Sequence, residues 1–322
     1  MNGMWVKMEV DDAENTSSSW MIRLAVVLII AASFWFVFQD LAHNHIAFND
    51  VISESSIQLW FGGGLIILLM VVWPLVWMVM MRGCGAEIPL RETYAIWWTT
   101  NIAKYVPGKV SLIAGRAWVA RKWGSKVVLE CFAWEVVIST SSALIAACLL
   151  LSSSEIDIFW KVLLGIAAVF SLVPLLSLET TQRILRKPIA MLGKGEWNEP
   201  IAMTRGHYLR ALLLMIGSWG IWGIAHQLIL IGIGIEVPLE VLIGVFALAW
   251  LAGFFAFFLP AGIGVREGSL TYLITMLASG GAGAILAIIS RTFNIIGEIF
   301  AFFIGGLLLK GTTLETTSIE DE

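Results

Sequence analysis

The sequence predicts an all-α, polytopic membrane protein with about seven to eight transmembrane helices and two membrane-dipping hairpins, near residues 94–118 and 260–279. Three observations support this fold class. Of the 322 residues, 58% are hydrophobic and only 14% are charged, and the mean hydropathy is +0.85. Several apolar runs reach about 20 residues, which is the length that crosses a bilayer as a helix. Lys and Arg also alternate between loops, as they do around membrane spans.

Apolar runs of membrane-spanning length define the expected elements in order. An eighth apolar segment, at 269–279, is short. It either crosses a thin part of the bilayer or enters and leaves the membrane on the same side. The first run lacks a small-residue cleavage site and is expected to be a retained helix. We expect one transmembrane domain over 20–310 between acidic tails at 1–19 and 311–322. The seven runs cover residues 20–38, 57–81, 127–152, 159–178, 211–231, 239–259 and 283–308.

The distribution of Lys and Arg predicts the orientation of the chain. The loops 82–126 and 179–210 carry eight and six of these residues, whereas 39–56, 153–158 and 232–238 carry none. Basic loops are retained on the cytoplasmic side. We therefore expect a cytoplasmic N-terminus in the cell (plasma) membrane, and a cytoplasmic C-terminal tail. The formal net charge of −4 gives no argument for nucleic acid as a partner.

Tryptophan is frequent, with 16 residues, and several stand near the expected span ends. Trp60, Trp73, Trp77, Trp97 and Trp160 are examples. An amphipathic indole suits the headgroup region of a bilayer. The sequence therefore favours interfacial anchoring for these side chains.

The segment N-I-A-K-Y-V-P-G-K-V at 101–110 interrupts the apolar pattern. Pro107 and Gly108 would make a turn there, because proline cannot continue a helix and glycine accepts unusual dihedral angles. Broken helices are tolerated at membrane depth where they line a cavity, and their free ends suit charged ligands. This predicts an anion site, unless the hairpin lies on the cytoplasmic surface and its basic residues reach lipid phosphates. The anion-binding residues would be Lys104, Lys109 and Arg116.

A second interruption, F-F-L-P-A-G-I-G-V-R-E-G, lies at 257–268. Corresponding Gly/Pro-interrupted segments in two halves of a transporter point to its binding site. The two segments therefore suggest an internal repeat, although their order of charges differs. The residues of interest are Pro260, Gly262, Gly264, Arg266 and Glu267.

Charged residues also occur inside expected spans. Arg291, Asn294 and Glu298 recur at spacings that place them on one helical face. That face should point into the protein or a water-filled cavity. Glu130 and Glu135 raise the same expectation for the span 127–152. Ion pairing between helices is the alternative role for all five.

These motifs resemble the transmembrane region of lysylphosphatidylglycerol synthases, also called the flippase-like family. In that family such domains move or bind lipids with charged or glycosylated headgroups. The resemblance extends from about residue 20 to residue 310. It rests on K-Y-V-P-G-K-V at 104–110 with Arg116, V-L-E at 128–130, P-A-G-I-G-V-R-E-G at 260–268 and S-R-T at 290–292.

The resemblance assigns Lys104, Pro107, Lys109 and Arg116 to the first family motif. Gly262, Gly264, Arg266 and Glu267 match the second, and Arg291 matches the arginine of the last helix. Two positions depart from the family pattern, Cys131 after V-L-E and Ala261 within the second motif. The chain stops at Glu322 without an aminoacyl-transferase domain, so synthesis of an aminoacyl lipid is not expected.

The sequence and the resemblance together predict a lipid translocase, with no catalytic residue, metal or cofactor. Its ligand would be a membrane lipid with an anionic headgroup, such as polyprenyl phosphate, a glycosylated form of it or a phospholipid. Substrate-binding roles are expected for Lys104, Lys109, Arg116, Arg266, Glu267 and Arg291. Structural or gating roles are expected for Pro107, Gly108, Pro260, Gly262, Gly264, Glu130, Glu135, Asn294 and Glu298.

Two alternatives remain open at this stage. The first is an integral membrane enzyme, such as a lipid-linked sugar transferase, in which Glu130, Glu135, Glu267 or Glu298 acts as a general base. The four histidines show no metal-ligand spacing that would support it. The second is a non-transporting scaffold that presents the basic loop 179–210 to a glycosyltransferase, a lipid-modifying enzyme or anionic lipid.

Overall fold

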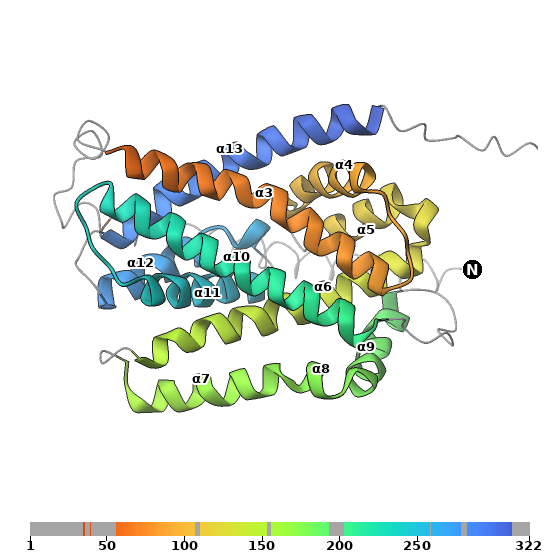
Figure 1. Ribbon diagram of the computed structural model, residues 1–322, viewed down its shortest axis with the longest axis horizontal. Coiled ribbons are helices and arrows are strands. Elements are labelled where there is room, and N and C mark those ends of the chain that lie inside the picture. Colours follow the sequence, from red (N-terminus) through yellow and green to blue (C-terminus); the bar gives the residue numbers. More distant parts are fainter. Residues whose placement is uncertain are drawn as a thin grey trace, which may run out of the picture.

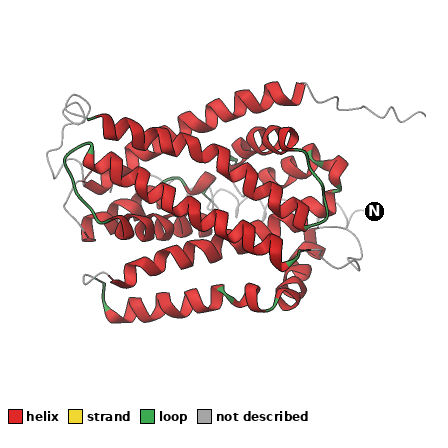
Figure 2. Cartoon of the chain, in the orientation of Figure 1, coloured by secondary structure: helices red, strands yellow, loops and turns green. Residues whose placement is uncertain are grey.

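The computed structural model describes residues 56–106, 110–152, 156–192, 203–257, 259–277 and 282–310, together with the isolated residues 35 and 39. Every regular element in these ranges is a helix (Figure 2). This confirms the all-α prediction. The first expected span, 20–38, both tails and the tip residues Pro107, Gly108 and Lys109 lie outside the described residues.

The described chain forms eleven α-helices and four short 3₁₀ helices. In chain order they are α3 Ile57–Gly83, α4 Leu90–Asn101, η1 Ile102–Tyr105, α5 Val110–Val119, η2 Arg121–Trp123, α6 Ser125–Ala147, η3 Cys148–Ser152, α7 Ile158–Ser171, α8 Val173–Leu176, α9 Leu178–Leu192, α10 Arg205–Ile231, α11 Leu239–Phe255, η4 Pro260–Gly262, α12 Val265–Leu277 and α13 Ala282–Lys310.

Five helical stretches in the described ranges are long and apolar enough to cross a membrane. They coincide with five of the predicted spans, and their length and composition support a membrane protein. The apolar helix α11 has only 17 residues, and it ends at Phe255 rather than near 259 because Pro260 follows closely and disfavours helix before it. The five stretches are Ile57–Gly83, Ser125–Leu151, Ile158–Leu176, Arg205–Ile231 and Ala282–Lys310.

The helices α3 and α10 run side by side in opposite directions through the middle of the molecule (Figure 1). Their backbones approach closely, since a Cβ atom built on Gly62 would stand 2.5 Å from the carbonyl oxygen of Ala225. The helix α13 packs across α3 and α4, and α6 packs against α10 and α11. These contacts bury an apolar core between the long helices.

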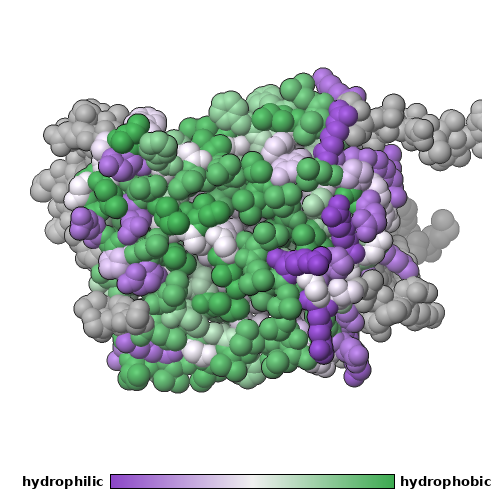
Figure 3. Space-filling view, in the orientation of Figure 1, coloured by the Kyte–Doolittle hydropathy of each residue, from purple (hydrophilic) through white to green (hydrophobic). Residues whose placement is uncertain are grey.

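The outer surface is hydrophobic over the middle of the molecule. Figure 3 shows a broad hydrophobic band between hydrophilic patches at the two ends. Much of the outer face of α7 consists of exposed apolar side chains, including Ile158, Phe159, Trp160, Val169 and Phe170. Exposed apolar surface of this extent is expected where lipid is the solvent.

Two pairs of shorter helices enter the bundle from opposite ends (Figure 1). The helices α4 and α5 pack together at one end, and α11 and α12 pack together at the other. Each pair is joined through a 3₁₀ helix, η1 or η4, and these two 3₁₀ helices contact each other inside the molecule. The two interruptions seen in the sequence therefore meet.

The turn around η4 depends on an unusual backbone. Ala261, Gly262 and Gly264 have φ angles of 51°, 66° and 86°, a region that glycine occupies without steric cost. A Cβ atom on Gly262 would stand only 2.5 Å from the carbonyl oxygen of Gly253. Gly262 is therefore needed both for its dihedral angle and for the close approach of η4 to α11.

Both described parts of the basic segment 179–210 are largely helical. The helix α9 covers residues up to Leu192, and α10 begins at Arg205, earlier than the predicted 211. The Thr204 hydroxyl caps α10 by accepting a hydrogen bond from the His207 N–H at 3.4 Å. The cap explains why the helix begins before the apolar run does.

Candidate functional site

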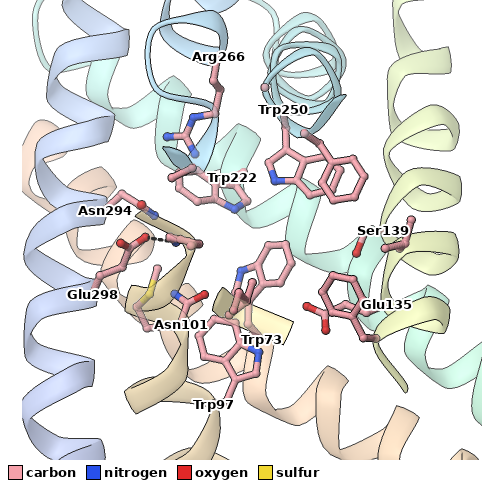
Figure 4. Close-up of a pocket in the computed structure, with 18 of the residues that line it drawn as sticks. Trp73, Trp97, Asn101, Glu135, Ser139, Trp222, Trp250, Arg266, Asn294 and Glu298 are labelled. Carbon is pink, nitrogen blue, oxygen red and sulfur yellow. Dashed lines mark hydrogen bonds and ion pairs between the residues drawn. The ribbon is translucent and has the colours of Figure 1, made fainter. Parts of the chain in front are cut away.

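A cavity of about 190 Å³ lies where the two helix pairs meet. Residues from α3, α4, η1, α5, α6, α10, α11, η4, α12 and α13 line it, so it collects side chains from most of the described helices. In Figure 4, Asn294 and Glu298 lie toward one side of the cavity and Glu135 and Ser139 toward the other, with large aromatic rings between them. A concave apolar site with a few converging polar groups is the usual form of a ligand site.

The first charged group joins η1 to α13. The Lys104 ammonium lies 2.6 Å from Glu298 Oε1, and the Tyr105 hydroxyl donates a hydrogen bond to Glu298 Oε2 at 2.8 Å. Arg291 Nη2 in turn donates to the Tyr105 oxygen at 3.3 Å. Glu298 is thus held by two neighbours from the first interruption, and the sequence analysis missed Tyr105. Its position next to Lys104 was the available signal.

The second charged group lies at the start of α12. Arg266 Nε and Arg291 Nη1 each stand 3.6 Å from Glu267 Oε1. The Gly264 N–H donates a hydrogen bond to Glu267 Oε2 at 2.8 Å. Glu267 therefore reaches back to the residue before the helix, as the glutamate of a capping box does. A negative charge is also favoured at a helix N-terminus.

The two guanidinium groups keep unused donors. An arginine has five N–H donors. Within the described ranges, the contact with Glu267 at 3.6 Å is the one charged contact of Arg266 that falls within ion-pair distance, and Arg291 adds the bond to Tyr105. Both side chains line the cavity, and Figure 4 shows the Arg266 guanidinium pointing into it. The cavity thus receives N–H groups that suit a phosphate oxygen.

Arg116 lies behind the lining rather than in it. Its side chain is only 2% exposed and its Nη1 lies 2.8 Å from Glu135 Oε2. Its Nε donates to the Thr100 hydroxyl at 3.4 Å, and its guanidinium carbon lies 5.5 Å and 5.9 Å from the ring centres of Trp77 and Trp97. Glu135 lines the cavity, so Arg116 acts on the site through Glu135.

Aromatic rings make most of the remaining wall. Trp250 stacks on Phe254 with ring centres 4.9 Å apart, and Trp222 stacks on Phe246 at 4.4 Å. The interfacial interpretation is wrong for Trp77 and Trp97, because both rings are buried in the apolar core between the helices. The aromatic lining consists of Trp73, Trp97, Phe132, Trp222, Trp250 and Phe254.

The remaining predicted residues divide clearly. Asn294 lines the cavity, Pro260 begins η4, and Glu130 is buried on α6 away from the lining. Lys109 lies outside the described residues. In the ranges that the structure describes, no three His, Cys, Asp or Glu side chains gather as metal ligands.

The chain matches no protein-family model, and no curated protein matches it.

Proposed function

We propose that this protein is a lipid translocase that passes a phosphate-bearing headgroup through the cavity while the lipid tails stay in the bilayer. The observation that carries the proposal is the partly buried cationic cluster of Lys104, Arg266 and Arg291 at the meeting point of the two interruptions. The cluster contains two carboxylates, Glu267 and Glu298, so its formal charge is three minus two, or +1. A headgroup carrying one negative charge would balance it.

The helix lengths support two membrane-dipping hairpins. At 1.5 Å per residue, the 13 residues of α12 extend about 20 Å, too short for a hydrocarbon core of about 30 Å. The pairs α4–α5 and α11–α12 would thus enter from opposite faces and place η1 and η4 near the bilayer centre. The five long helices and the expected span at 20–38 would then make six crossings, with both termini cytoplasmic.

Glu267 would serve as an internal substitute for the lipid phosphate. It occupies the N-terminus of α12 between two guanidinium groups, which is where an oxyanion would bind. An arriving phosphate would compete with this carboxylate for Arg266 and Arg291. When no lipid is bound, the Glu267 carboxylate would pair with the two arginines in place of water. After a phosphate has bound, the same carboxylate would compete with it and favour its release.

Reconstituted transport tests the proposal. Purified protein would be placed in liposomes containing a fluorescent phosphatidylglycerol or a labelled polyprenyl phosphate, and the rate of leaflet exchange would be measured. Arg266→Gln and Arg291→Gln should each slow exchange about 10- to 100-fold, since a hydrogen bond to a charged group contributes about 1.5–3 kcal/mol. Arg183→Gln, an exposed position on α9, is the matched control and should behave as the native protein does.

Mass spectrometry of the same lipids separates transport from chemistry. Unchanged lipid mass with faster exchange supports the translocase. A change in mass would support the membrane enzyme instead. Native exchange rates in folded Arg266→Gln and Arg291→Gln proteins would contradict the cationic-cluster mechanism, and exchange no faster than in empty liposomes would leave the scaffold role.

A further inference from the structure

We propose that the aromatic side of the cavity binds a neutral polyhydroxylated ring, a sugar or an inositol, attached to the lipid phosphate. This inference rests on the proposed translocase function and names its substrate class. The ligand would then be a phosphodiester with two recognised parts. Arg266 and Arg291 would hold the phosphate, and the tryptophan wall would hold the ring.

The cavity is divided along its length in a way that fits such a ligand. Figure 4 shows Arg266, Asn294 and Glu298 toward one side and Glu135 and Ser139 toward the other. The indoles of Trp73, Trp97, Trp222 and Trp250 stand between these two sides. The apolar C–H face of a sugar ring stacks on an indole, while its hydroxyl groups need hydrogen-bond partners at the ring edge.

Polar groups are available at that edge. Asn101, Ser139 and Glu135 all line the cavity. An amide offers both donors and acceptors, and a hydroxyl can act as either. A polyol can exchange hydrogen bonds with these groups, whereas an apolar tail cannot.

A cationic headgroup fits the same wall less well. Aromatic cages do bind ammonium groups, but both lining carboxylates are already paired with protein cations. Glu135 is held by Arg116 at 2.8 Å, and Glu298 is held by Lys104 at 2.6 Å. With these pairs in place, the aromatic side has no free negative charge to offer an amine. A neutral ring requires none.

The test compares lipids that share one charge and differ in the ring. Labelled phosphatidylinositol and phosphatidylglycerol each carry one negative charge, and phosphatidylcholine supplies a quaternary ammonium. In proteoliposomes of the native protein, we expect phosphatidylinositol to exchange at least about tenfold faster than phosphatidylglycerol. A parallel pair, the methyl and hexose phosphodiesters of one polyprenol, also shares one negative charge and shows whether the ring is recognised on a glycerolipid or on a polyprenyl lipid.

Substitutions locate the preference in the cavity. Trp250→Leu and Asn101→Leu should each reduce the ratio of the ring-bearing rate to the ring-free rate to near one, and Trp250→Tyr should restore much of it. Trp160→Leu is the matched control, because Trp160 is 60% exposed on α7, outside the cavity. It should leave both rates unchanged. The native comparison needs no substitution, so a misfolded variant does not remove the test.

Each result has one meaning. Equal native rates for the ring-bearing and ring-free lipids of both pairs, well above empty liposomes, would overturn the ring site and leave the translocase intact. If phosphatidylcholine exchanged faster than phosphatidylinositol, the aromatic side would bind an ammonium group and the proposal of a neutral ring would be wrong. Exchange of every lipid at the rate of empty liposomes would instead refute the translocase proposal itself.

Discussion

Lys104 and Glu298 are separated by 194 positions in the chain, yet the lysine Nζ and the glutamate Oε1 lie 2.6 Å apart. The pair fastens η1, in the first interruption, to the middle of α13. Glu298 Oε2 also accepts a hydrogen bond from the Tyr105 hydroxyl, so each carboxylate oxygen has a hydrogen-bond donor. This junction closes one side of the cavity.

Breaking that junction should destabilise the protein. Lys104→Met leaves the Glu298 carboxylate, whose side chain is 6% exposed, without its cation. Removing one partner of a buried pair costs about 3–5 kcal/mol, whereas replacing both by apolar residues is often near neutral. We expect a lower Tm in detergent for Lys104→Met and for Glu298→Gln, and recovery of most of the loss in the double variant Lys104→Met/Glu298→Met.

Two results would argue against this account. One is a double variant as unstable as the sum of the single variants, because that would show the two side chains to be independent. The other is an equal loss of Tm in Lys122→Met, whose side chain is 46% exposed in a surface pair with Glu92. Exposed pairs contribute only about 0–1 kcal/mol.

Gly262→Ala should destabilise the protein strongly, although it adds only one methyl group. The added Cβ would stand 2.5 Å from the Gly253 carbonyl oxygen at a φ angle of 66°, and such strained dihedral angles cost about 1–3 kcal/mol for residues other than glycine. We expect loss of thermal stability and of lipid exchange together. Gly217→Ala on α10 is the comparison, because a Cβ there meets nothing within 4 Å and alanine favours helix by about 1 kcal/mol. Similar Tm values for the two variants would contradict the structure.

Arg116→Lys should show that charge alone does not satisfy this site. The planar guanidinium contacts Glu135, Thr100 and the faces of Trp77 and Trp97, and an ammonium group cannot reproduce all of them. We expect a stability loss of about 1–3 kcal/mol, measured by chemical unfolding in detergent. Arg121→Lys, at an exposed position beside Trp118, should stay within about 0.5 kcal/mol of the native protein.

Cysteine labelling should reveal the hairpin α11–α12. In a protein with Cys84, Cys131 and Cys148 replaced, a membrane-impermeant thiol reagent should label Arg183→Cys only from the cytoplasmic face. Glu236→Cys should be labelled only from the opposite face. Phe257→Cys, near the expected hairpin tip, should be labelled from neither side. Rapid cytoplasmic labelling of Phe257→Cys would mean that α11 crosses the membrane completely.

The sequence predicted the long helices well, because an apolar run of membrane length has few alternatives. The ends of the helices were less accurate, since Pro260 shortens α11 and the Thr204 cap extends α10. The site was predicted in part. Arg266, Arg291 and Lys104 do meet at one cavity, as their charges suggested. Charge gave no means of knowing which carboxylate each would contact.

Those partners follow from tertiary packing rather than from local pattern. Lys104 reaches Glu298 because α4 packs along α13, and Arg116 reaches Glu135 because α5 lies against α6. The tryptophans show the same effect, because an indole at a span end can face lipid or the core. Only the arrangement of the helices distinguishes Trp77, which is buried, from Trp60, which is 55% exposed.

The close contact between Gly253 and Gly262 also limits how the molecule can move. With less than a side chain's width between η4 and α11, the turn cannot bend without separating the two backbones. We therefore expect α11, η4 and α12 to behave as one rigid body. At the cationic cluster, the 3.6 Å ion pair between Glu267 Oε1 and Arg291 Nη1 joins this body to α13. A rocking motion of this body would stretch that long contact first and keep the short hydrogen bonds intact.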